Sequence, residues 1–500
     1  MLSVRPVFSR VALCVLIAVT WGCAFAQPRR EAPAGRPTAA ARGAALAGRN
    51  GEPVTPDAAV ATFDAVWTKI RDSHYDSTLK GVNWNGARAE LRPRAERAGT
   101  VGELRTVIDT LLGRLGESHF VLIPQEVADG VTPDSALTGR RAARGEGTAR
   151  RERTERRERT KPAGEAGDVG LSVRLVGDEV VVARLERGGA AAWAGVRIGW
   201  VVDSVAAVSP KAVRRAADTL KTPAARRAVA TRLPYSVERL LQGPVGSRVR
   251  VVFRDGQDRR VALALERWPT PGKAVRFGNL PAMIARLQHE RLPAPDGGCV
   301  GVIRFNVWMT PIMAAFDEAM EEVRACRGVV LDLRGNPGGV GGMVMGVGGH
   351  FLTAPTPLGT LRSRDGELRF VANPRVVNNK GQAVRPFAGP LAIVIDETSA
   401  STSEIFAAGM QSVRRARLFG VTSAGQALPA QLFRVPSGDV LMYVVADFTA
   451  PDGRRIEGRG AVPDETVPVT RADLLAGRDA PVLAALRWID AERTAVMPTP

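Results

Sequence analysis

Three short, almost continuously apolar segments constrain the fold of this chain more than any other feature. They are CVGVIRFN (299–306), GVVLDLRG (328–335) and LAIVID (391–396), and stretches with helical spacing separate them. Strands that are apolar on both faces are typical of a parallel sheet covered by helices on each side. We therefore predict a multidomain α/β protein with its α/β core at residues 267–470.

Two of these strands end in turns rich in small residues. LDLRGNPGGVGG (331–342) leads into the helical stretch MVMGVGGHFL. Glycines let the backbone approach a ligand and direct N–H groups toward it. The spacing fits neither GxGxxG nor GxxxxGK[ST], so it does not indicate a nucleotide site. An oxyanion hole and a plain strand-to-helix turn both remain open.

The second turn lies in IDETSASTSEIFAAGMQ (395–411), where Ser399, Ser401 and Ser403 crowd together. A serine here lies at the carboxyl end of a sheet and near a helix N-terminus, whose dipole favours negative charge. This position suits a nucleophilic serine, although the motif is not GxSxG, and it equally suits an N-cap. The turn alone does not decide between the two roles.

The segments around the core differ from it in composition. Apolar residues repeat at three and four through 55–116, and Thr100 with Glu103 forms a capping-box start. Short β-rich pieces with a helical insert near 209–242 follow. The predicted order is a signal peptide (1–26), a flexible linker (27–52), an N-terminal helical domain (53–125), a basic disordered loop (126–165), a β-rich domain (166–266), the core (267–470), and a C-terminal helix and tail (471–500).

The net charge of +18 invites a nucleic-acid interpretation, but the charge is unevenly spread. Residues 140–161 hold ten Arg/Lys and four Glu in one low-complexity run. Such a run is typical of a solvated loop, and its alternative role is non-specific contact with anionic lipid or nucleic acid. We predict no specific nucleic-acid partner.

The N-terminus resembles an export signal. Arg5 and Arg10 precede the apolar stretch VALCVLIAVTWGCAFA, and Ala24-Phe25-Ala26 is a small-x-small cleavage site. The stretch is shorter than the roughly 20 residues of a membrane span. We predict an exported protein, periplasmic or extracellular, without a transmembrane span after cleavage. An uncleaved anchor and lipidation at Cys23 are the alternatives.

Two cysteines, Cys299 and Cys326, remain after signal cleavage, each just before an apolar strand. Parallel neighbouring strands would place both thiols at one edge of the sheet. A disulfide in an oxidising compartment is then one state, and two separate buried thiols are the simpler one.

DLRGNPGG followed some 60 residues later by DETSASTSEIFAAGMQ resembles the tail-specific, or C-terminal processing, family of serine proteases. The resemblance covers roughly residues 55–470 and implies a ClpP/crotonase-like core. It also implies that Ser401, the first serine of the S-x-S-E pattern, is the nucleophile. The oxyanion donors would be the N–H groups of Thr402 and Gly338.

The best-known branch of this family pairs the serine with a lysine 25 positions later. Here that position holds Gln426, and no lysine follows Lys380. A glutamine amide is no general base near neutral pH. Either the protein is inactive, or another residue takes the proton.

Histidine is the natural alternative, because its pKa is near 6.5 in the free state. The branch that resembles the tricorn core keeps its base in a "SH" pair, supported by a distant glutamate in an IExxGxxPD phrase. These features match Ser118, His119 and Glu457. The resemblance thus implies a Ser-His-Ser-Glu tetrad, in which His119 deprotonates Ser401 and Glu457 orients the imidazole or Ser118.

The remaining histidines carry no metal-site pattern such as HxxxH, so no metal or other cofactor is predicted, and His350 is interpreted as structural. The β-rich segment VGLSV…GGAAAWAGVRIGWVVDSVAAV…GPVGSRVRVVF resembles a PDZ domain. That resemblance implies that the loop Gly170-Leu171-Ser172 binds a peptide C-terminus, which adds a strand to the sheet edge. A PDZ-shaped domain used only for packing or gating is the alternative.

The combined prediction is an exported serine endopeptidase that acts on proteins or peptides with unstructured C-termini. The alternative is a catalytically inactive peptide- or lipophile-binding scaffold with the same fold.

Overall fold

The computed structural model describes residues 48–129, 166–219, 223–276, 283–294 and 297–496. The predicted signal peptide, most of the linker and the basic run 140–161 lie outside these residues. The chain divides into two compact units. The described residues within 48–52, 124–270 and 471–477 belong to the first unit, and those within 53–123, 271–470 and 478–496 belong to the second.

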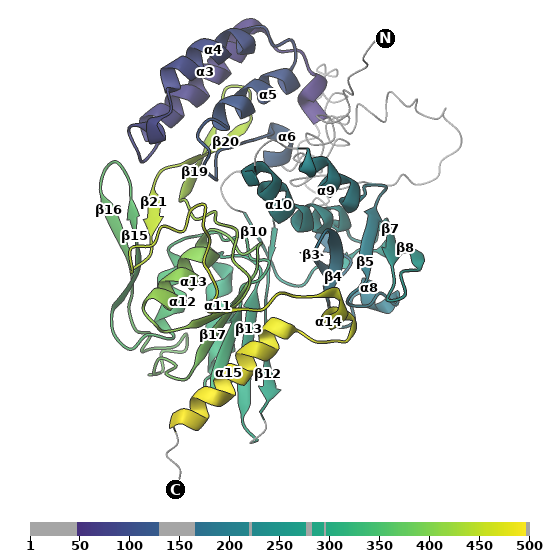
Figure 1. Ribbon diagram of the computed structural model, residues 1–500, viewed down its shortest axis with the longest axis vertical. Helices are drawn as coiled ribbons and strands as arrows, with labels where there is room; N and C mark the ends of the chain where they lie inside the picture. The colour runs from purple at the N-terminus through teal and green to yellow at the C-terminus, as the bar shows by residue number, and fades with distance from the viewer. Residues whose placement is uncertain (1–47, 130–165, 220–222, 277–282, 295–296, 497–500) are drawn as a thin grey trace, which may run out of the picture. The chain divides into compact units, whose positions relative to one another are not determined.

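A six-stranded sheet forms the centre of the second unit (Figure 1). Its first strand pairs antiparallel and the other pairs are parallel. The three apolar segments of the sequence are adjacent strands of this sheet. The order is β12 (Leu287–Pro293), β13 (Cys299–Phe305), β14 (Gly328–Asp332), β17 (Leu391–Ile395), β18 (Arg417–Gly420) and β22 (Glu465–Thr466).

Both faces of this sheet are covered, which explains why its strands are apolar throughout. On β14, Val329 and Leu331 pack into one hydrophobic cluster, and Val330 packs into another. The first cluster joins the sheet to helices α11 (Pro311–Val323), α12 (Met343–Gly349) and α13 (Thr402–Ser412). The second joins it to α15 (Ala480–Val496), drawn in yellow in Figure 1. The predicted α/β class is confirmed.

The helical segment 53–123 belongs to the same compact unit as this sheet. Thr100 caps its third α-helix as predicted, with its hydroxyl accepting from the Glu103 N–H at 3.2 Å. The helices share one core with the sheet β1-β20-β19. The elements are α3 (Pro56–Ser73), η2 (Leu79–Gly81), α4 (Trp84–Glu96), α5 (Val101–Leu112), β1 (Val121–Ile123), β19 (Ala430–Arg434) and β20 (Val440–Val444).

Two smaller sheets complete the second unit. One pairs β10 (Lys273–Val275) with β11 (Met283–Ala285), and the other has the order β16-β15-β21, with β15 (Thr356–Arg362), β16 (Glu367–Ala372) and β21 (Asp447–Thr449).

The first unit is built on an antiparallel five-stranded sheet with β3 at one edge. Two helices, α9 (Pro210–Asp218) and α10 (Pro223–Leu241), occupy the predicted helical insert, and α10 packs against β3. The sheet strands are β3 (Leu171–Val176), β4 (Glu179–Leu185), β5 (Val201–Val205), β7 (Arg248–Arg254) and β8 (Arg260–Glu266). The remaining elements are η1 (Gly48–Gly51), α6 (Gln125–Ala128), β2 (Ala166–Asp168), α8 (Ala190–Trp193), β6 (Gly243–Pro244), β9 (Trp268–Pro269) and α14 (Arg471–Leu475).

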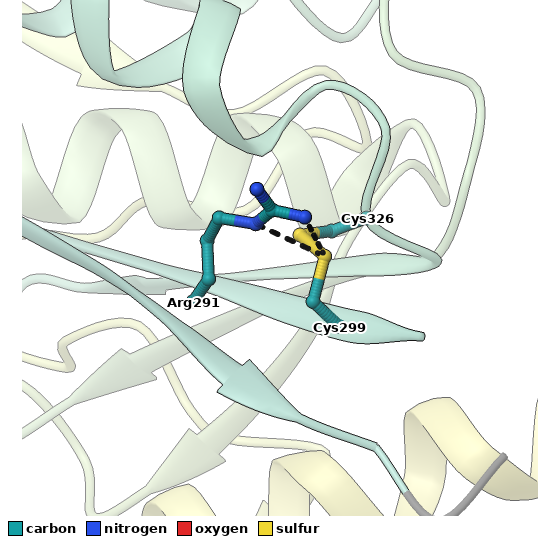
Figure 2. The surroundings of a disulfide bond; sticks show 3 residues. All are labelled: Arg291, Cys299 and Cys326. Carbon is teal, nitrogen blue, oxygen red and sulfur yellow. Dashed lines mark hydrogen bonds between the residues drawn. A yellow bond between two sulfur atoms is a disulfide. The ribbon is translucent and has the colours of Figure 1, made fainter. Parts of the chain in front are cut away.

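Cys299 and Cys326 form a disulfide, so the simpler expectation of two separate thiols is wrong. Cys299 opens β13 and Cys326 lies just before β14, and these strands are parallel neighbours. Figure 2 shows the Arg291 guanidinium directed at this bridge, with two nitrogens donating to Cys299 Sγ at 3.4 Å each. Within the described ranges, no helix has the length and apolar character needed to cross a membrane.

Candidate active site

Ser401 lies between the end of β17 and the start of α13, on a strained backbone. Its φ of 54° and ψ of −118° are unusual for a residue with a side chain. It is the N-cap of α13 and forms a capping box with Glu404. The Glu404 N–H donates to the Ser401 carbonyl oxygen at 2.9 Å, and the Ser401 N–H donates to Glu404 Oε2 at 3.0 Å. Main-chain hydrogen bonds on both sides therefore hold Ser401 in the turn.

The other two serine hydroxyls of this turn are engaged in structural hydrogen bonds. Ser399 Oγ donates to the Leu333 carbonyl at 2.9 Å and accepts from the Asp396 N–H at 3.0 Å. Ser403, inside the helix rather than at its cap, donates to the Asn336 carbonyl at 3.0 Å. Both side chains are completely buried. They join the Ser401 turn to the glycine-rich turn, whereas Ser401 itself is partly exposed.

Glu404 joins the Ser401 turn to the loop at residues 423–426. Its buried carboxylate accepts from Ser423 Oγ (2.6 Å) and from the N–H groups of Gly425 (2.6 Å), Gln426 (2.8 Å) and Ser401 (3.0 Å). Burial, opposed by these donors, raises the pKa of Glu404 to about 7. Glu404 therefore both caps α13 and joins it to the loop at residues 423–426.

Ser118, His119 and Glu457 come together although Ser118 and Glu457 are 339 positions apart. Ser118 Oγ lies 2.7 Å from His119 Nδ1 and donates to Glu457 Oε2 at 3.0 Å. The Ser118 N–H donates to Glu457 Oε1 at 2.9 Å. Because the single hydroxyl proton of Ser118 goes to the carboxylate, its oxygen accepts from His119 Nδ1–H. The imidazole then carries its lone pair on Nε2.

Glu457 also links Ser118 and His119 to the Ser401 turn. Burial raises the pKa of its carboxyl, and the hydrogen bonds from Ser118 and Ala427 oppose that rise. The Ala427 N–H donates to Glu457 Oε2 at 2.9 Å, and the carbonyl of the preceding Gln426 accepts from the Ser401 N–H at 2.9 Å. A continuous chain of hydrogen bonds thus runs from Ser401 to His119. All four residues of the implied tetrad lie in the second unit.

Gly338 lies directly against the Ser401 turn. A Cβ at this position would be 2.7 Å from Ser401 Cβ and 2.9 Å from the Thr402 nitrogen, so only glycine fits. Thr402 opens α13, where a backbone N–H has no intrahelical acceptor. The Gly338 N–H donates to Asn336 Oδ1 at 3.0 Å in this structure.

The other histidines form hydrogen bonds with other carboxylates, and His74 bonds to Glu117. His350 is buried with Nε2 2.7 Å from Asp317 Oδ1, and burial, opposed by that carboxylate, lowers its pKa. His289, on β12, pairs with Glu322 of α11. Among the described residues, no group of three or more His, Cys, Asp or Glu could hold a metal ion.

The loop predicted to bind a peptide terminus lies in the first unit. Gly170 has a positive φ of 72°, and its N–H donates to Asp168 Oδ1 at 2.7 Å. Leu171 opens the edge strand β3, and Ser172 pairs with Arg184 of β4.

Two family models match this chain. Residues 61–113, in the helical segment, match the tricorn protease C1 domain, and residues 299–467, from β13 through β22, match peptidase family S41. Residues 299–467 form a peptidase family S41 domain. The S41 domain contains Ser401, Gly338 and Glu457, while Ser118 and His119 follow the C1 match.

Curated relatives and solved structures agree with this assignment. The chain is 27% identical over 213 residues to the carboxyl-terminal-processing protease of Synechocystis, matching 42% of this chain and 47% of that protein. It is 25% identical over 240 residues to carboxyl-terminal-processing peptidase 2 of Arabidopsis thaliana, matching 47% of this chain and 43% of that protein. The chain therefore spans less than half the length of these relatives.

The fold resembles that of the photosystem II D1 C-terminal processing protease, with a TM-score of 0.51 and 21% identity over 86% of this chain and 96% of the other. It also resembles mature CPAF, with a TM-score of 0.51 and 13% identity over 87% of this chain and 96% of the other.

Several supporting residues were not identified from the sequence. The Asn336 side chain is completely buried and links the Phe305 carbonyl to the Gly338 N–H. Glu117 and Arg455, next to Ser118 and near Glu457, form an ion pair of 2.9 Å. Their positions directly before the SH pair and the IExxGxxPD phrase were the only signal available, because pairing across 338 residues leaves no local pattern.

Proposed function

We propose that this protein is an exported serine endopeptidase, with Ser401 as nucleophile and His119 as general base. The observation that carries the proposal is the hydrogen-bonded chain Ser401–Gln426–Ala427–Glu457–Ser118–His119 in one compact unit. It joins a strained serine to a histidine whose Nδ1 is held by a hydroxyl.

The chemistry follows from the hydrogen-bond directions. Ser401 Oγ attacks the scissile carbonyl carbon while its proton passes to His119 Nε2, and Glu457, through Ser118, stabilises the resulting imidazolium. The Thr402 N–H would stabilise the oxyanion, and the Gly338 N–H would join it once released from Asn336 Oδ1, to which it donates in this structure. The C–N bond then breaks as His119 returns the proton to the leaving amine. Water, deprotonated by His119, hydrolyses the acyl-enzyme and regenerates Ser401.

A fluorophosphonate probe tests the nucleophile directly, because it reacts with activated serines. We expect the wild type to be labelled, and Ser401→Ala and His119→Gln to lose labelling. His289→Gln is the matched control, because His289 is also paired with a glutamate but lies on β12, and it should label like the wild type. Equal absence of labelling in wild type and Ser401→Ala would instead favour the inactive scaffold.

The proposed substrates are proteins or peptides with unstructured C-termini, and the curated relatives are named for processing at the carboxyl terminus. A peptide C-terminus would bind at Gly170-Leu171-Ser172 and extend along the edge strand β3. In this structure the Val173 N–H of that edge donates to Glu238 Oε1 at 2.9 Å. A peptide with a free carboxylate should bind more tightly than its C-terminal amide in fluorescence anisotropy, and equal affinities would contradict this mode.

Export to the periplasm or the extracellular space is proposed from the N-terminal signal pattern. The Cys299–Cys326 disulfide supports it, because such bonds persist in oxidising compartments. N-terminal sequencing of the native protein should find Gln27 first. A mature chain that still begins at Met1 would contradict cleavage.

A further inference from the structure

A second buried polar cluster lies beside the Ser118–Glu457 pair, and the proposed mechanism does not use it. Its centre is the Glu117 carboxylate, whose side chain is 6% exposed. Glu117 accepts from Tyr75 OH (2.6 Å), from Arg455 (2.9 Å) and from His74 Nε2 (3.0 Å). Arg455 also pairs with Asp447 at 2.9 Å. The cluster is thus a fully bonded network around one carboxylate.

The network joins the same two chain segments that supply the tetrad. Glu117 immediately precedes Ser118, and Arg455 is two residues before Glu457. These segments are therefore joined at two points, by the Glu117–Arg455 ion pair and by the two hydrogen bonds from Ser118 to Glu457. The Glu117–Arg455 pair adds a second point of attachment, which restricts movement of the segments about the first.

The histidine segment needs such an anchor because its backbone is strained. His119 has a φ of 63°. On the far side of His119, β1 pairs with β20 from Val121 onward. On the near side, the Glu117 side chain is the anchor. Positive φ at a residue with a side chain persists only where the surroundings hold it.

We propose that Glu117 is a positioning residue that sets the orientation of Ser118 and His119 toward Glu457, acting through Arg455, Tyr75 and His74. This inference rests on the proposed function, because it deepens the account of the same site. It assigns to Glu117 no contact with the substrate.

The ionisation of the cluster agrees with its geometry. Burial raises the pKa of Glu117, but hydrogen bonds from His74, Tyr75 and Arg455 outweigh burial, and the pKa lies below its usual value. The Arg455 pKa is raised, because Asp447, Tyr75 and Glu117 outweigh the effect of burial. Glu117 and Arg455 are therefore a charged pair at neutral pH.

A purely structural role is the competing explanation, and the chain offers a matched control for it. Arg105 of α5 and Asp439, next to β20, form another buried ion pair with two hydrogen bonds of 3.0 and 2.6 Å. That pair also joins the helical segment to a distant part of the same unit. It contacts neither Ser118 nor Glu457 in the hydrogen bonds described above. Asp439→Asn should therefore lower stability without changing the chemistry.

The experiment compares Glu117→Gln with Asp439→Asn in the full chain, using the rate of fluorophosphonate labelling at saturating probe and the probe concentration at half saturation. We expect Glu117→Gln to lower the saturating rate by about 10- to 50-fold, with the half-saturating concentration within twofold. Asp439→Asn should stay within twofold in both, at a comparable loss of thermal midpoint. Arg455→Lys, which keeps the positive charge opposite Glu117, should retain most of the wild-type labelling rate.

Two results would overturn the proposal. One is a wild-type rate in Glu117→Gln, and the other is an equal loss of rate in Asp439→Asn at equal thermal midpoint. If Glu117→Gln does not fold, Tyr75→Phe removes only the hydroxyl that donates to Glu117. We then expect a loss of two- to fivefold, and an unchanged rate counts against the proposal.

A readout without catalysis separates this proposal from the proposed function. The chain has four histidines, so ¹⁵N-histidine labelling gives few imidazole signals, and His119→Gln assigns one of them. Absence of probe labelling in the wild type would refute the proposed function alone. The His119 Nδ1–H signal should still change in Glu117→Gln, and identical spectra would refute the positioning role.

Discussion

The two ends of the central sheet carry different chemistry. At the amino ends of β13 and β14, the Cys299–Cys326 disulfide joins neighbouring strands by a covalent bond. At the carboxyl ends of β14 and β17 lie the glycine-rich turn and the Ser401 turn, which hold residues with positive φ. At the amino ends a covalent bond restricts the chain. At the carboxyl ends hydrogen bonds hold Ser401 in a strained backbone conformation. The difference indicates that stability and reactivity can be perturbed separately.

The largest expected effect is at the carboxyl end. Ser401→Ala removes the nucleophile, and peptide hydrolysis should fall by about 10⁴-fold or more, equivalent to about 5 kcal/mol of transition-state stabilisation. Thermal unfolding should change little, because Ser401 is bound by its main chain. Hydrolysis of a peptide by purified protein measures the rate. Activity persisting at the wild-type rate would break the assignment.

Glu457→Gln should have a smaller effect, about 10³-fold on the same rate, because Glu457 acts on His119 through Ser118. The amide replaces an acceptor of three hydrogen bonds and removes the charge that stabilises the imidazolium. Single-turnover kinetics isolate the chemical step. A loss confined to substrate affinity would contradict the predicted role.

The disulfide predicts the reverse outcome at the amino end. Replacing both cysteines with serine should lower the free energy of unfolding by about 3–4 kcal/mol, from loop closure across a separation of 27 residues. Urea denaturation of oxidised wild type and the double variant measures it. The probe-labelling rate of the folded variant should remain within twofold, and a large loss would show that the two ends are coupled.

Glu404 predicts a pH dependence of about 3 kcal/mol or less. The pKa of Glu404 is about 7 in the folded state and near its ordinary value of 4.5 in the unfolded state. Between these two pH values, the Glu404 carboxyl is therefore protonated in the folded state and ionised in the unfolded state. The contribution is fully present below about pH 4.5 and is lost as the pH rises through about 7. The difference in stability between Ser401→Ala and Ser401→Ala/Glu404→Gln, measured from pH 4.5 to 8, should decline with rising pH. A flat difference would contradict this shift.

Much of the fold follows from local sequence. The apolar strands predicted the buried α/β sheet, and Thr100 predicted the start of its helix, because hydrophobic period and capping act over a few residues. The family resemblance assigned Gly338 of DLRGNPGG to the oxyanion hole, and in the structure Gly338 lies against the Ser401 turn, where only glycine fits.

The family resemblance selected Ser401 among the three serines, but the turn alone could not, because each hydroxyl stands in the same kind of turn. The structural roles of Ser399 and Ser403 came from tertiary contacts, their bonds to Leu333 and Asn336, which lie more than 60 residues earlier. The choice between a disulfide and two thiols likewise depended on strand pairing, which brings Cys299 and Cys326 together.

The sequence by itself determined which residues could react: a serine at a strand end, a histidine after a helix and a glutamate in a later turn. Only the tertiary structure decided that Glu457 and Ala427 connect Ser118 to the Ser401 turn, and that Glu117 and Arg455 repeat the link. The physical reason is that residue types and short-range spacing record local conformation. Hydrogen bonds between segments more than 300 residues apart exist only after the strands and helices have packed.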